Sequence, residues 1–105
     1  MQQMTENMHN SISMEELKEI VVPIAERYGV SKVKLFGSRA RGDFRADSDY
    51  DFLIDVGPNF GLIDLGCFTE DLEEALGVPV SIVDETAASS IFLKSINDDL
   101  KEIYG

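Results

Sequence analysis

The sequence predicts an α/β (α+β) fold in which helices flank a small mixed β-sheet. Segments whose apolar residues recur at helical spacing alternate with short segments of strand-forming residues. This order builds a sheet with helices packed against it. The chain has 105 residues, 44% of them hydrophobic, which suits one core and leaves little room for a second. We therefore expect a flexible tail at residues 1–12 and a single domain at residues 13–105.

A helix is predicted over residues 13–29, and a short strand over residues 32–37. Ser13 begins the helix as part of a capping box, and Gly29 supplies a stop at its carboxyl end. The apolar residues of the helix share one face, which predicts packing against the sheet. Pro23 lies inside the helix and favours a kink or a break at that point.

The second half of the chain continues the alternation. Residues 49–56 are typical of a strand, residues 62–77 of a helix ended by a glycine, and residues 78–84 of a third strand. Residues 87–104 are helical in character. Their apolar anchors recur at helical spacing and are Ile91, Phe92, Ile96, Leu100 and Ile103.

The charge of the chain is strongly acidic and unevenly distributed. A net charge of −11 argues against a general nucleic-acid-binding surface, because such a surface carries clustered Lys and Arg in excess. Residues 58–105 hold ten acidic and two basic side chains, against ten and seven in residues 1–57. The acidic half is either a solvated surface or a face that docks on a basic partner protein, and the sequence leaves both readings open.

Membrane and secreted classes do not fit this sequence. It has no apolar run near 18 residues, and its amino terminus lacks the basic flank and apolar run of a signal peptide. Cys67 is the single cysteine and cannot form an internal disulfide, which suits a reducing cytoplasm. His9 is the single histidine, so the sequence has too few histidines and cysteines for the common zinc sites and gives little basis for histidine catalysis. We expect a cytoplasmic protein that does not engage the membrane.

A dense polar loop, GSRARGDFRADSDYD, separates two predicted strands and ends in an acidic pair, Asp49 and Asp51. On a strand, residues two apart face the same side, with roughly 6–7 Å between their Cα atoms. Two carboxylates so placed repel each other unless a cation lies between them, and Mg²⁺ prefers carboxylates, water and substrate phosphates. Taken alone, such a pair in an acidic protein is also typical of a solvated strand end.

The start of the same loop has the residues of a phosphate-binding turn. Gly37 lets a ligand approach the backbone, and the Ser38 hydroxyl and nearby N–H groups can bind phosphate oxygens. Arg39, Arg41 and Arg45 add guanidinium groups, which suit phosphate recognition. The loop is not a P-loop, because no Lys-Ser/Thr follows its second glycine. Phosphate-binding and metal-binding groups at adjacent strand ends are what phosphoryl transfer from a nucleoside triphosphate requires.

The stretch FGSRARGDFRADSDYDFLIDV closely resembles the G-S-x(10)-D-x-D signature of the DNA polymerase β-like nucleotidyltransferases, in particular the minimal nucleotidyltransferases (the MNT-type antitoxins). The resemblance implies a nucleotidyltransferase fold, Mg²⁺ as cofactor and a nucleoside triphosphate, ATP, as substrate. It implies transfer of a nucleoside monophosphate to a hydroxyl group, such as a tyrosine of a HEPN-type toxin partner. The residues that it marks are Gly37, Ser38, Arg39 and Arg41 for the nucleotide, and Asp49 and Asp51 for metal binding and catalysis.

The sequence departs from the family pattern at Ser81, where the resemblance implies a third carboxylate that acts as general base and metal ligand. Asp84 lies three positions further and would face the opposite side of its strand. Asp55 shares the parity of the acidic pair but lies further along its strand. An alternative is therefore a catalytically impaired nucleotide-binding antitoxin that acts by steric block. The oligomeric state, a homo-oligomer included, stays open.

Overall fold

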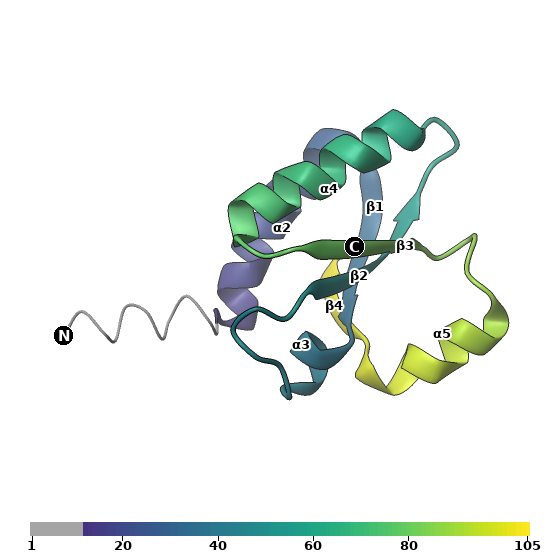
Figure 1. Cartoon of the computed structure of the whole chain (residues 1–105). Helices are drawn as coiled ribbons and strands as arrows, with labels where there is room; N and C mark the ends of the chain where they lie inside the picture. Colours follow the sequence, from purple (N-terminus) through teal and green to yellow (C-terminus); the bar gives the residue numbers. More distant parts are fainter. Residues whose placement is uncertain (1–11) are drawn as a thin grey trace.

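Four strands form one mixed sheet, in the order β3-β2-β1-β4, in the computed structural model, which describes residues 12–105 (Figure 1). The strands β2 and β3 are parallel, and β1 is antiparallel to both β2 and β4. The predicted mixed sheet with flanking helices is confirmed. Most of the predicted tail, residues 1–11, lies outside the described residues. The elements are α2 (Met14–Tyr28), β1 (Val30–Phe36), α3 (Ser38–Arg41), β2 (Tyr50–Val56), α4 (Leu62–Leu76), β3 (Val80–Asp84), α5 (Ser90–Ile96), the 3-10 helix η1 (Asn97–Asp99) and β4 (Lys101–Tyr104).

The helix α2 forms as the sequence predicts. The Ser13 hydroxyl accepts from the Glu16 N–H, and the Glu16 carboxylate accepts from the Ser13 N–H, each at 3.0 Å. Gly29 ends the helix in the left-handed conformation at φ 72°, which glycine adopts without a steric penalty. The helix runs through Pro23 as one element, so the break considered at this proline does not occur.

The two faces of the sheet are covered by different helices. Alternate strand residues such as Leu35, Phe52 and Ile54 pack in the larger core, together with the apolar faces of α2 and α4. The intervening residues Phe36 and Leu53 face the other side, where α5 covers them in a smaller cluster. Figure 1 shows α2 and α4 together on one side and α5 on the other. Side chains alternate between the two faces along β1 and β2. This alternation decides which residues lie on the face toward α5, which that helix covers only in part.

The prediction of a helical segment over residues 87–104 is wrong at its carboxyl end. The helical part ends with η1, and β4 then pairs with β1 through Lys34 and Leu35. Ile103 is 4% exposed and enters the larger core. Its spacing from Ile96 and Leu100 mimics a helix, but this distant strand pairing overrides the local pattern.

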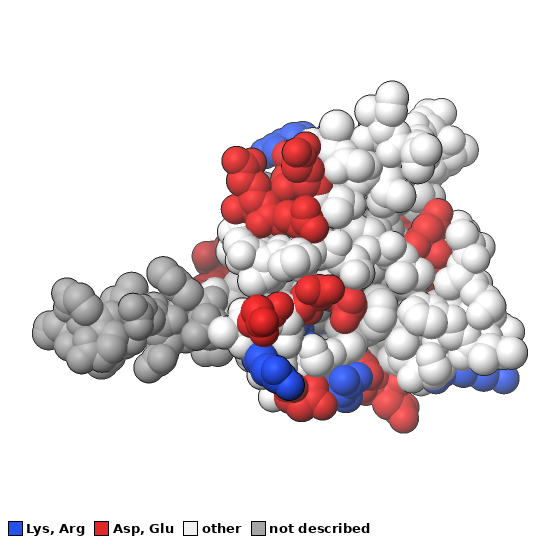
Figure 2. All heavy atoms as spheres, viewed as in Figure 1, with Lys and Arg blue, Asp and Glu red and all other residues white. Residues whose placement is uncertain are grey.

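Figure 2 shows acidic side chains over one end of α4, around the loop before β2 and near the end of β3. The helix α4 has no basic residue in its last turn and carries acids through its second half. Basic side chains lie directly below the acidic ones near the loop (Figure 2). No helix among residues 12–105 is both long and apolar enough to cross a bilayer.

Candidate functional site

The acidic pair, Asp49 and Asp51, lies at the amino-terminal end of the central strand β2. Asp51 is paired in register with Phe36 on β1 and with Ser81 on β3. Tyr50 is buried in the larger core, so Asp51 projects to the opposite face of the sheet. Asp49 directly precedes the strand and is exposed. The sheet thus presents the predicted carboxylates at the edge of its less covered face.

The charge state of Asp51 reflects this position. Burial raises the pKa of its carboxyl group above the ordinary value, and the charge of Asp49 raises that pKa further. A hydrogen bond with the Ser81 side chain and the positive charge of Arg41 act in the opposite direction. The negative charge of Asp49 beside the Asp51 carboxyl group is one that a bound cation would offset.

Gly37 brings the backbone of the loop against Asp51. It adopts φ 80° and ψ −160°, a region that is essentially restricted to glycine. A Cβ atom at this position would overlap the Asp51 carboxylate, with Cγ only 3.2 Å away. Ser38 follows as the first residue of α3. The glycine predicted for phosphate approach therefore has a direct structural requirement at the acidic pair.

The Gly37→Ala substitution should lower the free energy of unfolding by about 3 kcal/mol or more, since it adds an overlap to a strained backbone. Gly77 is a control for positive φ, because it has φ 79° and ψ 8° and nothing within 4 Å of a Cβ atom. The Gly77→Ala substitution should lower the free energy of unfolding by about 1 kcal/mol. Urea denaturation measures both values. Equal losses in the two variants would show that the Asp51 carboxylate exerts no steric constraint on Gly37.

Arg39 holds the loop that leads to the acidic pair. Its guanidinium lies 4.5 Å from the centre of the Phe44 ring and 4.4 Å from that of Tyr50, within range of a cation–π interaction. It also donates to the carbonyl oxygens of Ser48 at 2.9 Å and Ala46 at 3.2 Å. The side chain is 9% exposed and lies on the Tyr50 side of the strand. The structure does not bring Arg39 to the carboxylates, so its predicted contact with nucleotide stays a prediction.

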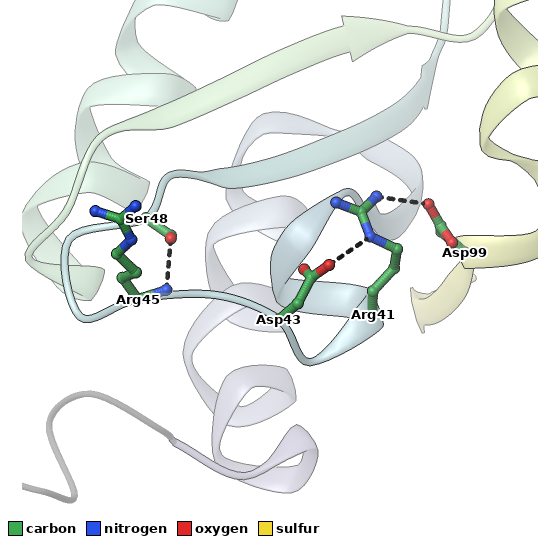
Figure 3. Close-up of polar contacts among 5 residues, drawn as sticks. All are labelled: Arg41, Asp43, Arg45, Ser48 and Asp99. Carbon is green, nitrogen blue, oxygen red and sulfur yellow. Dashed lines mark hydrogen bonds and ion pairs between the residues drawn. The ribbon is translucent and has the colours of Figure 1, made fainter.

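Arg41, the last residue of α3, is ion-paired from two sides. Its Nε donates to Asp43 at 3.2 Å, and its Nη1 donates to Asp99 at 3.0 Å (Figure 3). These two hydrogen bonds raise the pKa of the guanidinium, that with Asp43 more strongly. Arg45 closes a turn in the same loop, where its N–H donates to the Ser48 hydroxyl at 2.8 Å. Sequence reasoning missed Asp99, and no local signal marks it, since it lies 58 residues from Arg41.

A third carboxylate does not join the acidic pair within residues 12–105, where no three His, Cys, Asp or Glu side chains could hold a metal together. Ser81 occupies the position beside Asp51. The Asp84 carboxylate instead accepts from the N–H and hydroxyl of Thr86 in the turn after β3. Asp55 and Glu85 lie toward the opposite end of the β2–β3 pair.

The acidic pair nevertheless fits Mg²⁺. This ion is commonly held by one or two carboxylates, with waters and substrate phosphates in the remaining positions. Asp49 and Asp51 provide those two carboxylates, and the pKa of Asp51 is raised first by burial and then by the charge of Asp49. A site of this composition depends on the substrate for the rest of its ligands.

Removing the Asp51 charge should stabilise the metal-free protein. A pKa raised in the folded state means that this group favours folding below its unfolded pKa and loses that contribution as pH rises through the folded pKa. The Asp51→Asn variant should therefore melt about 2–4 °C higher at pH 7 in EDTA, and the difference should vanish near pH 3. Asp47→Asn, an exposed change in the same loop, is the control. A lower melting temperature for Asp51→Asn at pH 7 would contradict the electrostatic account.

Comparison with known sequences gives one family and a consistent set of relatives. The family model described as "Nucleotidyltransferase domain" matches residues 14–103. Protein adenylyltransferase MntA from Thermococcus cleftensis is 32% identical over 89 residues, which cover 81% of this chain and 90% of that protein. The match therefore includes the strands and helices that form the site.

Solved structures share the fold at lower identity. A chain of a toxin–antitoxin crystal structure with AMP-PNP superposes with a TM-score of 0.73 at 21% identity, covering 84% of this chain and 73% of that one. A chain from a complex of the tri-AMPylated HEPN toxin of Shewanella oneidensis with an MNT antitoxin gives 0.69 at 18% identity, with 89% and 73% covered. At these identities, the likeness shows a common fold.

Proposed function

The chain belongs to the nucleotidyltransferase domain family, and from this premise we propose that it binds ATP with Mg²⁺ and transfers AMP to a hydroxyl group of a partner protein. The observation that carries the proposal is the acidic pair at the end of β2, in which the Asp51 carboxylate packs against the Gly37 backbone. Metal-binding carboxylates beside a turn open to phosphate are the minimum arrangement for this chemistry.

Each predicted group has a role in this proposal. Asp49 and Asp51 would hold Mg²⁺, which supplies charge neutralisation at the phosphates when bound. Gly37 and Ser38 would contact the triphosphate, and Arg41 would add positive charge on the same side of the sheet. Arg39 would contribute to nucleotide binding by holding the loop in place, through its bonds to the loop carbonyls.

The proposed reaction exchanges a phosphoanhydride bond of ATP for a phosphate ester bond on the acceptor. The hydroxyl oxygen of the acceptor attacks the α-phosphorus of ATP, and the bond from that phosphorus to the bridging oxygen breaks. Pyrophosphate leaves, AMP becomes esterified to the acceptor, and the hydroxyl proton passes to water. With Ser81 in place of a carboxylate, none of residues 12–105 adds a third acidic group beside the pair to accept this proton. We therefore expect slow transfer.

The acceptor that we propose is a tyrosine of a HEPN-type toxin. The similar structure from Shewanella oneidensis pairs a tri-AMPylated HEPN toxin with an MNT antitoxin, and the Thermococcus relative is named a protein adenylyltransferase. The acidic surface over α4 (Figure 2) would suit a basic partner. A cytoplasmic location, favoured by the single cysteine, stays a prediction.

Ser81 also favours a second candidate function, in which the protein binds nucleotide and blocks its toxin sterically. Two carboxylates suffice to bind a metal–nucleotide complex, whereas the chemical step normally draws on a further base. On this reading the chain is an antitoxin without turnover.

One experiment tests the proposal and separates the two candidates. The full chain is incubated with α-labelled ATP, Mg²⁺ and the product of the neighbouring gene, and label on that protein is measured before its residual ribonuclease activity. We expect slow, Mg²⁺-dependent labelling of tyrosine that parallels the loss of ribonuclease activity. Equal neutralisation by the native chain and by Asp49→Asn, with no label on the partner, would favour steric block and contradict the proposed transfer.

A further inference from the structure

We propose that Asp99, on the 3-10 helix η1, is a positioning residue that holds the Arg41 guanidinium in the orientation required to bind the triphosphate. This inference rests on the proposed function, because it takes Arg41 to be a phosphate-binding group. It goes beyond the signature loop, since Asp99 lies in the carboxyl-terminal segment of the chain.

The geometry around Arg41 leaves one edge of its guanidinium available. Asp43 accepts from Nε and Asp99 accepts from Nη1. The Nη2 nitrogen makes no hydrogen bond to any of residues 12–105, and Figure 3 shows it directed away from Asp99. The guanidinium presents its donors as a planar fork, so fixing two of its nitrogens also fixes the direction of the third.

Arg41 would otherwise be poorly constrained. It ends a helix of only four residues, and its side chain is 48% exposed. An arginine in such a position samples many rotamers, and ordering it on ligand binding costs conformational entropy. The same short helix begins directly after Gly37, whose backbone packs against the Asp51 carboxylate, so Arg41 lies on the segment that adjoins the acidic pair.

Asp99 is the more rigid of the two partners of Arg41. Its side chain is 20% exposed, against 63% for Asp43. The segment that carries Asp99 is anchored by Ile96, which is 8% exposed and packs with Phe36 of β1. Phe36 and Phe92 also meet edge to face at 5.7 Å between ring centres. The carboxyl-terminal segment therefore fixes Asp99 against the strand that leads into the Gly37 turn.

The size of the expected energies favours positioning over stability as the role of this pair. Half-exposed ion pairs contribute little to folding, because water competes for both partners and the side chains lose freedom. Holding a binding group in its bound geometry, by contrast, improves affinity directly. A carboxylate near bound phosphates also repels them, and the two effects predict opposite results when Asp99 is neutralised.

Calorimetric binding of AMP-PNP in the presence of Mg²⁺ to the full chain tests the inference. Asp99→Asn should weaken binding about three- to tenfold, and Asp99→Glu should recover part of the loss. Asp98→Asn is the matched control. The carboxylate of Asp98, the residue next to Asp99, is exposed and makes no ion pair or hydrogen bond with the described residues. In an Arg41→Gln background, Asp99→Asn should have no further effect.

The outcomes separate the inference from the proposed function. Unchanged or tighter binding by Asp99→Asn overturns the positioning role, and so does an equal loss in the native and Arg41→Gln backgrounds, which indicates a general structural defect. If neither the native chain nor Asp98→Asn binds AMP-PNP with Mg²⁺, the proposed function itself fails.

Discussion

The Ser81→Asp variant is expected to transfer AMP about 100-fold faster than the native chain, because general-base catalysis typically contributes 10²–10⁴-fold. Ser81 is exposed and lies in register with Asp51 on the adjacent parallel strand. An aspartate there would add a carboxylate to the face that carries the acidic pair. That carboxylate could accept the hydroxyl proton of the acceptor and add a ligand for Mg²⁺.

The matched control for this prediction is Ser81→Asn, which adds a side chain of the same shape without the charge. It should leave the transfer rate within about threefold of the native rate, since an amide is not a useful base at neutral pH. The rate is measured as α-label appearing on the partner protein. Equal rates for Ser81→Asp and Ser81→Asn would contradict the claim that a missing carboxylate limits the reaction.

The Asp49→Asn variant is expected to lose AMP transfer by a factor on the order of 10²–10³ or more. Asp49 is one of two carboxylates at the proposed metal position, and no third His, Cys, Asp or Glu among residues 12–105 joins them. The loss of one therefore leaves a single charged ligand, whereas a complete three-carboxylate site would retain two.

Asp47→Asn serves as the control for Asp49→Asn, because Asp47 is an exposed residue of the same loop, two positions away. It should retain transfer at close to the native rate. Binding of AMP-PNP is measured alongside, with Mg²⁺ and with EDTA. If Asp49→Asn keeps both its transfer rate and its Mg²⁺-dependent binding, the acidic pair is not the metal site.

The parts of the fold that depend on neighbouring residues could be predicted from the sequence. The capping box at Ser13 and the stop at Gly29 mark α2 through local hydrogen bonds and backbone preference. The strand β4 could not be predicted in this way. Its pairing with β1 is a contact between distant segments, and its single buried residue, Ile103, continues the helical spacing of the residues before it.

In the candidate site, too, features set by neighbouring residues could be predicted from the sequence, and features set by contacts between distant segments could not. Strand alternation predicts that Asp49 and Asp51 lie on one side, and the structure brings the Gly37 backbone against Asp51. The burial of Arg39 between two rings and the ion pair between Arg41 and Asp99 depend on how the loop and the carboxyl-terminal segment fold together. Residue type alone does not distinguish an arginine that holds a loop from one that faces a ligand.

The most direct test of the central claim compares two labelled forms of ATP in the same reaction with the native chain, Mg²⁺ and the neighbouring gene product. Nucleotidyl transfer leaves the α-phosphate on the acceptor and releases the γ-phosphate in pyrophosphate. We predict label on the partner from α-labelled ATP and none from γ-labelled ATP. Label from γ-labelled ATP, or no label from either form, would contradict the assignment of the chain as an AMP-transferring enzyme.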